Sequence, residues 1–238
     1  MSKTFITFGA GGDQYINAGN RLLKQADNTD LFDKTILYKE CDLKNDTDFW
    51  SKHGEFISKN KRGYGYWLWK PYLIKKTMSS LKDGDILMYL DCGCEIDIRQ
   101  KQKIIEYFEI VKNDYICGCL TTCHPPEKAW CKMDLLIKLN IFDEDILNSP
   151  QRQAGAQLIY VCEKTRSLIN EWYDIVSTDY HMIDDSRSIV SNYPEFKEHR
   201  HDQSTFSLLT KKYGLFSSHS MFKCIRYDRN KSGTSKIK

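Results

Sequence analysis

A short apolar run near the middle of the chain is bounded on both sides by polar residues. Residues 86–90 read Ile-Leu-Met-Tyr-Leu; they follow the turn Lys82-Asp83-Gly84-Asp85 and lead directly into Asp91-Cys92-Gly93-Cys94-Glu95. Such a run predicts a buried strand that begins sharply after a solvent-exposed turn. Asp91 would then stand at the carboxyl end of the strand, where open α/β sheets bind ligands. A carboxylate at the end of so apolar a strand needs a partner, which we expect to be a cation, a phosphate-bound metal or an Arg or Lys side chain.

Strand-like and helix-like segments alternate along the rest of the chain. Strands are predicted at residues 3–8, 34–38, 86–90, 115–120, 157–162 and 214–217. Helices are predicted at residues 13–26, 46–59 (with a break near Gly54), 68–81, 99–112, 127–139, 164–177 and 203–212. This alternation favours an α/β fold with a mostly parallel central sheet flanked by helices. The 238 residues contain no composition break, repeat or linker, so one domain is expected.

The composition narrows the class of protein. The formal net charge is only +3, and the basic residues are scattered among acidic ones, which disfavours a nucleic-acid partner. No apolar stretch approaches the roughly 20 residues of a transmembrane segment, and the N-terminus lacks the apolar run of a signal peptide. A cytoplasmic protein is expected, and peripheral association with a membrane stays open.

The cysteine pattern suggests reduced thiols. Nine cysteines are an odd number, and nothing in the sequence indicates an oxidising compartment. Six of them lie close together in sequence, with His124 beside the fifth: Cys92, Cys94, Cys117, Cys119, Cys123 and Cys131. The group contains no Cys-x-x-Cys pair, so small buried side chains explain it better than a zinc site does.

Two segments in the first third of the chain carry candidate binding residues. Gly9-Ala10-Gly11-Gly12 is either a phosphate-contacting loop or a plain turn, since Gln14 stands where the dinucleotide fingerprint needs glycine. Residues 62–71 (RGYGYWLWKP) place four aromatic rings, two glycines and two cations within ten positions. Aromatic faces stack on bases or sugars and the cations can meet phosphate, so a binding role is favoured over core packing.

Two later segments are polar. Residues 151–157 (QRQAGAQ) precede a predicted strand and form either a close-approach surface for hydroxyl-rich ligands or an ordinary loop. Residues 199–204 (HRHDQS) begin a predicted helix. Asp202 suits the N-cap of this helix, and the surrounding His, Arg and Gln side chains also suit an acceptor or general-base site.

Taken together, these segments resemble a GT-A-fold glycosyltransferase of the small kind found in polysaccharide-synthesis loci of bacteria and in large DNA viruses. The resemblance covers about residues 3–220 and rests on residues 62–71, 89–96 (YLDCGCEI), 153–157 (QAGAQ) and 201–204 (HDQS), in that order. It implies one glycosyltransferase domain over residues 1–238. The nucleotide-sugar-binding half would span about residues 1–100, the acceptor-binding half about 101–220, and a flexible tail about 229–238.

The resemblance also implies an activity and a metal. A sugar would pass from a nucleoside-diphosphate sugar, expected to be UDP-linked, to a glycan acceptor hydroxyl with Mn²⁺ or Mg²⁺, in the cytoplasm (the host cytoplasm if the source is viral). Asp91 matches the first acid of the Asp-x-Asp motif that holds the metal, but Gly93 stands in place of the second. Glu95 is the candidate replacement. His219 resembles the late histidine of glycogenin-like relatives, so the implied metal ligands are Asp91, Glu95 and His219.

The remaining implied roles follow the same motifs. The donor-binding residues would be Phe8, Gly9, Ala10, Gly11, Arg21, Trp67, Lys70, Asp91, Cys92 and Gly93. The acceptor-binding residues would be Gln153, Gly155, Gln157, His201 and Gln203. Asp202 would act in catalysis with Asp91, taking the acceptor proton in an inverting reaction or orienting substrate in a retaining one; the sequence leaves the stereochemistry open.

Two alternatives from other classes remain. Because Gly93 replaces the second acid, the chain could also be a catalytically inactive protein that binds a sugar nucleotide or a glycan. Residues 9–12 permit a dinucleotide-dependent oxidoreductase, which we expect less.

Overall fold

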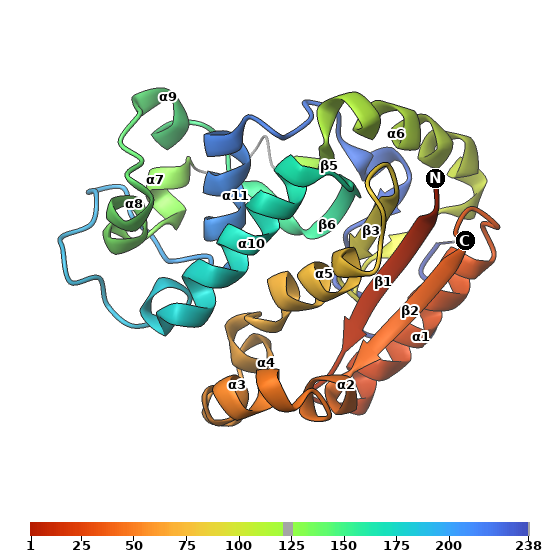
Figure 1. Ribbon diagram of the computed structural model, residues 1–238, viewed down its shortest axis with the longest axis horizontal. Helices are drawn as coiled ribbons and strands as arrows, with labels where there is room; N and C mark the ends of the chain where they lie inside the picture. Colours follow the sequence, from red (N-terminus) through yellow and green to blue (C-terminus); the bar gives the residue numbers. More distant parts are fainter. Residues whose placement is uncertain (121–125, 238) are drawn as a thin grey trace.

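A five-stranded sheet in the order β2-β1-β3-β6-β5 forms the centre of the structure (Figure 1). The structure is a computed structural model that describes residues 1–120 and 126–237. Strand β1 pairs in parallel with β2 and β3, whereas β6 is antiparallel to both β3 and β5. Only β6 therefore runs against the other four strands, and the predicted α/β fold with a mostly parallel sheet is confirmed.

The strands and helices have the following bounds. The strands are β1 (Lys3–Gly9), β2 (Lys34–Lys39), β3 (Ile86–Leu90), β4 (Glu95–Ile96), β5 (Ile116–Leu120), β6 (Arg152–Tyr160) and β7 (Ile225–Arg226). Strands β4 and β7 pair in a small antiparallel sheet of their own. The helices are α1 (Asp13–Asp27), α2 (Glu40–Lys44), α3 (Thr47–Lys59), α4 (Gly63–Tyr66), α5 (Trp69–Ser79), α6 (Lys101–Asp114), α7 (Glu127–Trp130), α8 (Met133–Leu139), α9 (Glu144–Leu147), α10 (Glu163–Thr178) and α11 (Asp202–Tyr213).

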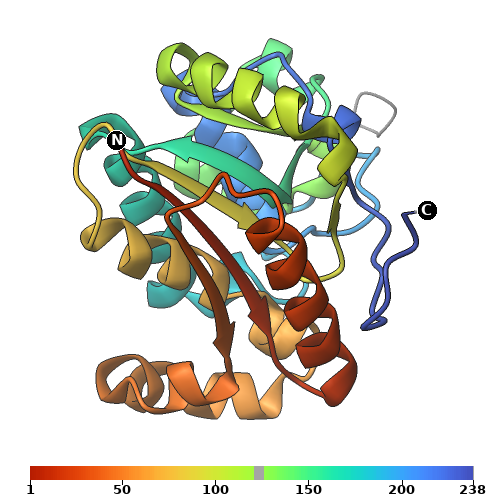
Figure 2. The ribbon, with the colours of Figure 1, turned by 90° about the vertical axis from the view of Figure 1, so that its right-hand side faces the viewer.

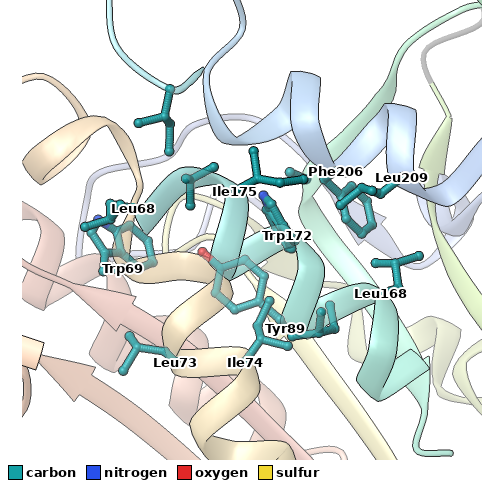
Figure 3. Packing of buried hydrophobic residues seen from close by; sticks show 14 of the residues in the cluster. Leu68, Trp69, Leu73, Ile74, Tyr89, Leu168, Trp172, Ile175, Phe206 and Leu209 are labelled. Atoms are coloured by element: carbon teal, nitrogen blue, oxygen red, sulfur yellow. The ribbon is translucent and has the colours of Figure 1, made fainter. Parts of the chain in front are cut away.

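Helices cover both faces of the main sheet, because successive strand side chains point to opposite sides. On one face, Leu87 and Tyr89 of β3 pack in the layer of α5, α10 and α11. On the other face, Met88 packs in the layer of α1 and α6. Figure 2 shows α1 on one side of β1 with α5 and α10 on the other. Trp172 of α10 and Phe206 of α11 have ring centroids 4.9 Å apart and lie beside Tyr89 (Figure 3).

Strand β3 has the bounds that its apolar run predicted. All five of its side chains are buried, because β3 lies between β1 and β6 with helices above and below. The polar residues before it make the expected turn: Asp85 accepts hydrogen bonds from the backbone N–H groups of Ser2 (2.6 Å) and Lys82 (3.0 Å). This strand places Asp91 at the centre of one edge of the sheet.

Four element predictions differ from the structure. Helix α3 runs unbroken through Gly54, which packs under the ring of Trp50. The predicted helix 127–139 is two helices, α7 and α8, because the chain turns at Lys132 to bury the ammonium group against the carbonyl oxygens of His181 (2.7 Å) and Ser186 (2.9 Å). Strand β6 begins at Arg152 rather than at residue 157. Residues 214–217 form no strand, and the next strand is β7.

Two sequence predictions concern the molecule as a whole. Within residues 1–120 and 126–237, none of the helices combines the length and the apolar character that a bilayer crossing requires. The cysteines of these ranges are free thiols. Burial raises the pKa of both Cys117 and Cys119 to about 12, which makes them unreactive at neutral pH. Cys123 and His124, part of the cysteine group considered for zinc, lie outside the described residues.

Candidate functional site

A pocket of about 690 Å³ lies at the carboxyl ends of β1 and β3. The end of β1 contributes Phe8, Ala10 and Gly11, and the loop after β3 contributes residues 91–94. The antiparallel strand β6 begins at the same edge and adds Ala154 and Gly155. Three further segments complete the walls: side chains from residues 61–70, from residues 198–203 and from residues 227–231. The pocket therefore gathers parts of the chain that are far apart in sequence.

Lys70 joins the two candidate catalytic carboxylates. Its Nζ lies 2.6 Å from Asp202 Oδ2 and 3.2 Å from Asp91 Oδ1. Lys70 is only 2% exposed and Asp202 only 4%. Burial alone would lower the pKa of Lys70, but the carboxylates of Asp202 and Asp91 outweigh it and hold the pKa above its ordinary value. The lysine is therefore charged, and Asp91 has the basic partner that its apolar strand required.

Asp202 is a buried carboxylate that titrates near neutrality. It is the first residue of α11, one position after the N-cap residue His201, whereas the sequence predicted Asp202 itself at the N-cap. Burial raises the pKa of Asp202 to about 6, and the charge of Lys70 opposes this rise. A carboxyl group with such a pKa can exchange a proton with a substrate hydroxyl at physiological pH.

Two tyrosines hold the carboxylate of Asp91 in place. The Tyr89 hydroxyl donates to Asp91 Oδ1 over 2.5 Å, and the Tyr227 hydroxyl donates to Asp91 Oδ2 over 3.4 Å. A Cβ atom at Gly155 would overlap both the Tyr227 hydroxyl and the Asp91 carboxylate. Glycine is therefore needed at this point of β6, and Gly155 contributes to the pocket through close packing.

The segment 62–71 forms an aromatic wall. Tyr64, Trp67 and Trp69 line the pocket. Tyr64, Tyr66 and Trp67 have φ angles of 52°, 51° and 61°, in the left-handed region that residues with a Cβ rarely adopt. Each such residue costs on the order of 1–3 kcal/mol, and these conformations concentrate at functional sites. The indole N–H of Trp69 donates to the carbonyl oxygen of Gly63 over 3.0 Å and fixes the wall from within.

Arg21, predicted to bind the nucleotide, does not line the pocket. Its Nη2 donates to the carbonyl oxygens of Cys92 (2.9 Å) and Cys94 (2.7 Å). Its Nη1 donates to the carbonyl oxygens of Asn230 (3.1 Å) and Ser232 (2.8 Å). The side chain is 7% exposed. Arg21 thus ties the loop after β3 to the C-terminal segment, and both of its Nη atoms donate inside the fold.

The predicted metal ligands Asp91, Glu95 and His219 are not brought together. Glu95 is buried, and its oxygens accept hydrogen bonds from the C-terminal segment. His219 is half exposed; its Nδ1 lies 2.9 Å from the Ser217 hydroxyl and 3.4 Å from Asp114. In the described part of the chain, no three His, Cys, Asp or Glu side chains lie together in a way that could hold a metal ion.

The predicted acceptor residues divide into two groups. His201 and Gln203 line the pocket beside Asp202, and the His201 ring stacks on Tyr66 with centroids 5.3 Å apart. Gln153 and Gln157 do not line it. Both belong to β6, which the sequence predicted to begin later, and the Gln157 amide N–H₂ donates to the carbonyl oxygen of Ala154 inside the fold.

The remaining predicted donor residues lie at the end of β1 and after β3. Phe8, Ala10, Gly11, Cys92 and Gly93 line the pocket, and so do Trp67 and Lys70. Gly9 does not line it. A Cβ atom there would lie 2.7 Å from the carbonyl oxygen of Tyr15, so this glycine allows the first turn of α1 to pack against the end of β1.

Three pocket cations, Lys61, Arg229 and Lys231, lie outside the segments predicted to bind a ligand, and a fourth, Arg200, belongs to the predicted segment 199–204. Arg200 pairs with Glu198 over 2.8 Å. Among the residues that the structure describes, none forms an ion pair with Lys61, Arg229 or Lys231. Counting Arg62 and Lys70, six Lys and Arg side chains line the pocket against the three carboxylates Asp91, Glu198 and Asp202. Arg62 also pairs with Asp185 over 3.0 Å, so the cations best placed to meet an anionic ligand are Lys61, Arg229 and Lys231.

Comparisons with known proteins give distant similarity only. No protein-family model and no curated protein matches the sequence. The fold is similar to that of mouse xyloside xylosyltransferase 1 in its apo form, with a TM-score of 0.46 and 11% identity over 91% of this chain and 84% of that chain.

Two other solved structures are similar at the same level. The galactosyltransferase LgtC, in complex with donor and acceptor sugar analogues, has a TM-score of 0.46 and 12% identity over 90% of this chain and 72% of that chain. A glycosyltransferase involved in the glycosylation of the major capsid of PBCV-1 has a TM-score of 0.42 and 8% identity over 81% of this chain and 82% of that chain. At these low identities and TM-scores, the similarity does not indicate a donor, an acceptor or a metal for this protein.

Proposed function

We propose that this protein transfers a sugar from a nucleoside-diphosphate sugar to a hydroxyl group of a glycan acceptor. The observation that carries the proposal is the Asp91–Lys70–Asp202 cluster, which lines a pocket with an excess of positive charge at the carboxyl end of β3. It combines a fixed cation, suited to a phosphate leaving group, with a carboxylate that titrates near neutrality. The cation favours departure of the diphosphate, and the carboxylate can take the proton of the attacking hydroxyl in an inverting reaction.

The donor fits the side of the pocket between β1 and the aromatic wall. Tyr64 and Trp67 offer flat faces for a nucleobase, and Ala10 and Gly11 leave room for close approach of the ligand to the backbone. The diphosphate would lie toward Lys70, the buried cation of the cluster. A UDP-linked donor remains our expectation for this subsite.

In the proposed transfer, the acceptor oxygen forms a bond to the anomeric carbon while the bond from that carbon to the diphosphate oxygen breaks. The electron pair of that bond leaves with the nucleoside diphosphate. In an inverting reaction the acceptor proton passes to Asp202; in a retaining reaction it passes to the leaving phosphate oxygen, and Asp202 orients the acceptor. His201 and Gln203 adjoin Asp202 in the pocket and would contact the acceptor.

The test is a panel of UDP-, GDP- and CDP-linked sugars incubated with the protein and candidate glycan acceptors, with release of nucleoside diphosphate as the readout. We expect one donor to be turned over. Asp202→Asn should reduce release by about 100-fold or more, the usual effect of losing a general base, while binding of the nucleoside diphosphate persists. If the wild-type protein neither binds nor turns over any donor, the proposal fails.

One observation favours a second function, the binding of a sugar nucleotide without catalysis. Position 93 has no carboxylate, although the resemblance calls for a second acid there. This alternative predicts saturable binding of one donor but no release of nucleoside diphosphate with any acceptor. The same panel separates the two functions.

A further inference from the structure

The position that lacks the second acid is covered by the C-terminal end of the chain. A Cβ atom at Gly93 would lie 2.9 Å from the Cα and 3.2 Å from the carbonyl carbon of Arg229. The backbone N–H of Asn230 donates to the carbonyl oxygen of Gly93 over 2.8 Å. Backbone atoms therefore occupy the space that a side chain at position 93 would need. We call residues 229–236 the C-terminal strap.

The strap is anchored by buried polar contacts, although this end of the chain was predicted to be a flexible tail. Asn230 is 2% exposed, and its Nδ2 donates to Glu95 Oε1 over 2.8 Å. The Ser235 hydroxyl donates to Glu95 Oε2 over 2.5 Å, and the backbone N–H of Lys236 donates to both oxygens. Burial would raise the pKa of Glu95, but these donors and the charge of Arg21 hold it at about 2. Glu95 is therefore ionised, and its carboxylate anchors the strap by accepting these hydrogen bonds.

The anchoring carries two cations into the pocket. Asn230 points inward to Glu95, and its neighbours Arg229 and Lys231 both line the pocket. Lys231 Nζ lies 5.0 Å from the ring centroid of Tyr15, at the start of α1. Arg229 has a φ angle of 51°, a strained conformation that the contacts on either side of it maintain. Figure 2 shows this end of the chain running beside α1.

The residues present do not fit the Mn²⁺ or Mg²⁺ ion that the resemblance implies. Such an ion takes about six oxygen ligands. Asp91 Oδ1 already faces the ammonium of Lys70 at 3.2 Å, position 93 has no side chain, and Glu95 is bonded to the strap. The ammonium of Lys70 lies against one oxygen of Asp91, and the Tyr227 hydroxyl lies against the other. Protein side chains, rather than a metal ion, must therefore bind the diphosphate in the proposed reaction.

We propose that Lys70, Arg229 and Lys231 take the place of a divalent cation, so that the diphosphate is bound and its leaving charge neutralised by the protein alone. The inference rests on the proposed function and names the side chains that would bind the diphosphate. Arg21 and Glu95 are positioning residues, because they hold the strap and do not meet the ligand. In this arrangement the glycine at position 93 is a requirement of the strap rather than the loss of a metal ligand.

The experiment measures binding of UDP, GDP and CDP by calorimetry, with protein stripped of metal by EDTA and with Mn²⁺ restored. We expect the dissociation constant of the preferred nucleotide to agree within about twofold between the two conditions. Arg229→Met and Lys231→Met should each weaken binding about tenfold or more, the usual loss for a charge-assisted contact. Glu95→Gln should weaken it through the strap and raise exchange of the strap amides with solvent.

Lys223→Met is the matched control, because Lys223 is an exposed lysine near the strap in sequence that does not line the pocket. Its nucleotide affinity should equal that of the wild type. Nucleotide binding that is lost in EDTA and restored by Mn²⁺ would overturn this inference and leave the proposed glycosyl transfer standing. An equal loss in the Lys223 and Lys231 variants would also overturn it. No nucleotide binding in either condition would overturn both proposals.

Discussion

Lys70 Nζ lies 2.6 Å from Asp202 Oδ2, and both side chains are buried although they come from distant parts of the chain. The contact joins the first turn of α5 to the first turn of α11, on either side of the pocket. The same pair therefore contributes to the stability of the fold and to the charge of the site.

Replacing Lys70 with Met should destabilise the protein. The substitution removes the cation between the carboxylates of Asp91 and Asp202. The two negative charges then repel each other, and that of Asp202 is buried without a partner. Loss of one partner of a buried ion pair costs about 3–5 kcal/mol of unfolding free energy. Urea unfolding measures the cost. Asp202→Asn is the control and should lower the unfolding free energy by less, because Lys70 retains its ion pair with Asp91. An equal loss in the two variants would contradict this account of the cluster.

The pKa of Asp202, raised to about 6, predicts opposite pH effects on activity and stability. In an inverting reaction the ionised form is needed, so transfer should slow as the pH falls through about 6. For stability, a carboxyl pKa raised on folding contributes stability that is fully present below its ordinary value of 3.8 and is lost as the pH rises through about 6. The pH profiles of kcat/KM and of Tm measure both effects. Asp202→Asn should remove the stability effect, and a Tm profile unchanged by the substitution would refute the assignment.

Restoring an acid at position 93 should harm the protein rather than create a metal site. Gly93→Asp would push against the backbone of Arg229, since even its Cβ would lie 2.9 Å from that Cα. We expect displacement of the strap, faster proteolysis after Tyr227, and nucleotide affinity reduced about tenfold. Gly93→Ala has the same steric conflict without the charge and should behave alike. Tighter nucleotide binding in Gly93→Asp with Mn²⁺ would speak for a metal site instead.

Arg21→Lys should fail to preserve the function of Arg21. The guanidinium donates to four carbonyl oxygens at once, from the loop after β3 and from the strap. A lysine has three donors on one nitrogen and cannot span both segments. We expect a loss of about 2–3 kcal/mol of unfolding free energy and greater solvent exchange in the strap. Hydrogen exchange followed by mass spectrometry resolves the two regions, and unchanged protection of residues 229–236 would contradict the assigned role.

Much of the fold follows from local patterns. The apolar run of β3, its preceding turn and the helical spacing of α6 and α10 are signals that a few neighbouring residues carry, and each of these elements lies where the sequence predicts. The aromatic segment 62–71 and the carboxylate Asp91 stand out for the same reason. Their gathering at one sheet edge follows from the parallel strand order, which the alternation of elements favours.

Side-chain direction was harder to predict wherever an element boundary was misplaced. Because β6 begins at Arg152 rather than at residue 157, Gln153 belongs to a strand and not to a polar loop before it. Gln157 is fully buried because it pairs with Tyr89 of β3 on one side and with Gly118 of β5 on the other. Of residues 153–157, only Ala154 and Gly155 line the pocket.

The composition and order of the chain were enough to indicate an α/β sheet, an acidic loop at the end of its central strand and an aromatic segment beside it. They could not indicate which charges meet in the pocket. The ion pair of Lys70 with Asp202, the cover that Arg229 forms over Gly93 and the capture of Glu95 by Asn230 all join residues far apart in sequence. Such contacts leave no periodicity in the sequence, and basic residues near a chain end usually remain solvated. Only the folded chain brings these groups within a few ångströms of one another, at distances where charge and steric exclusion act.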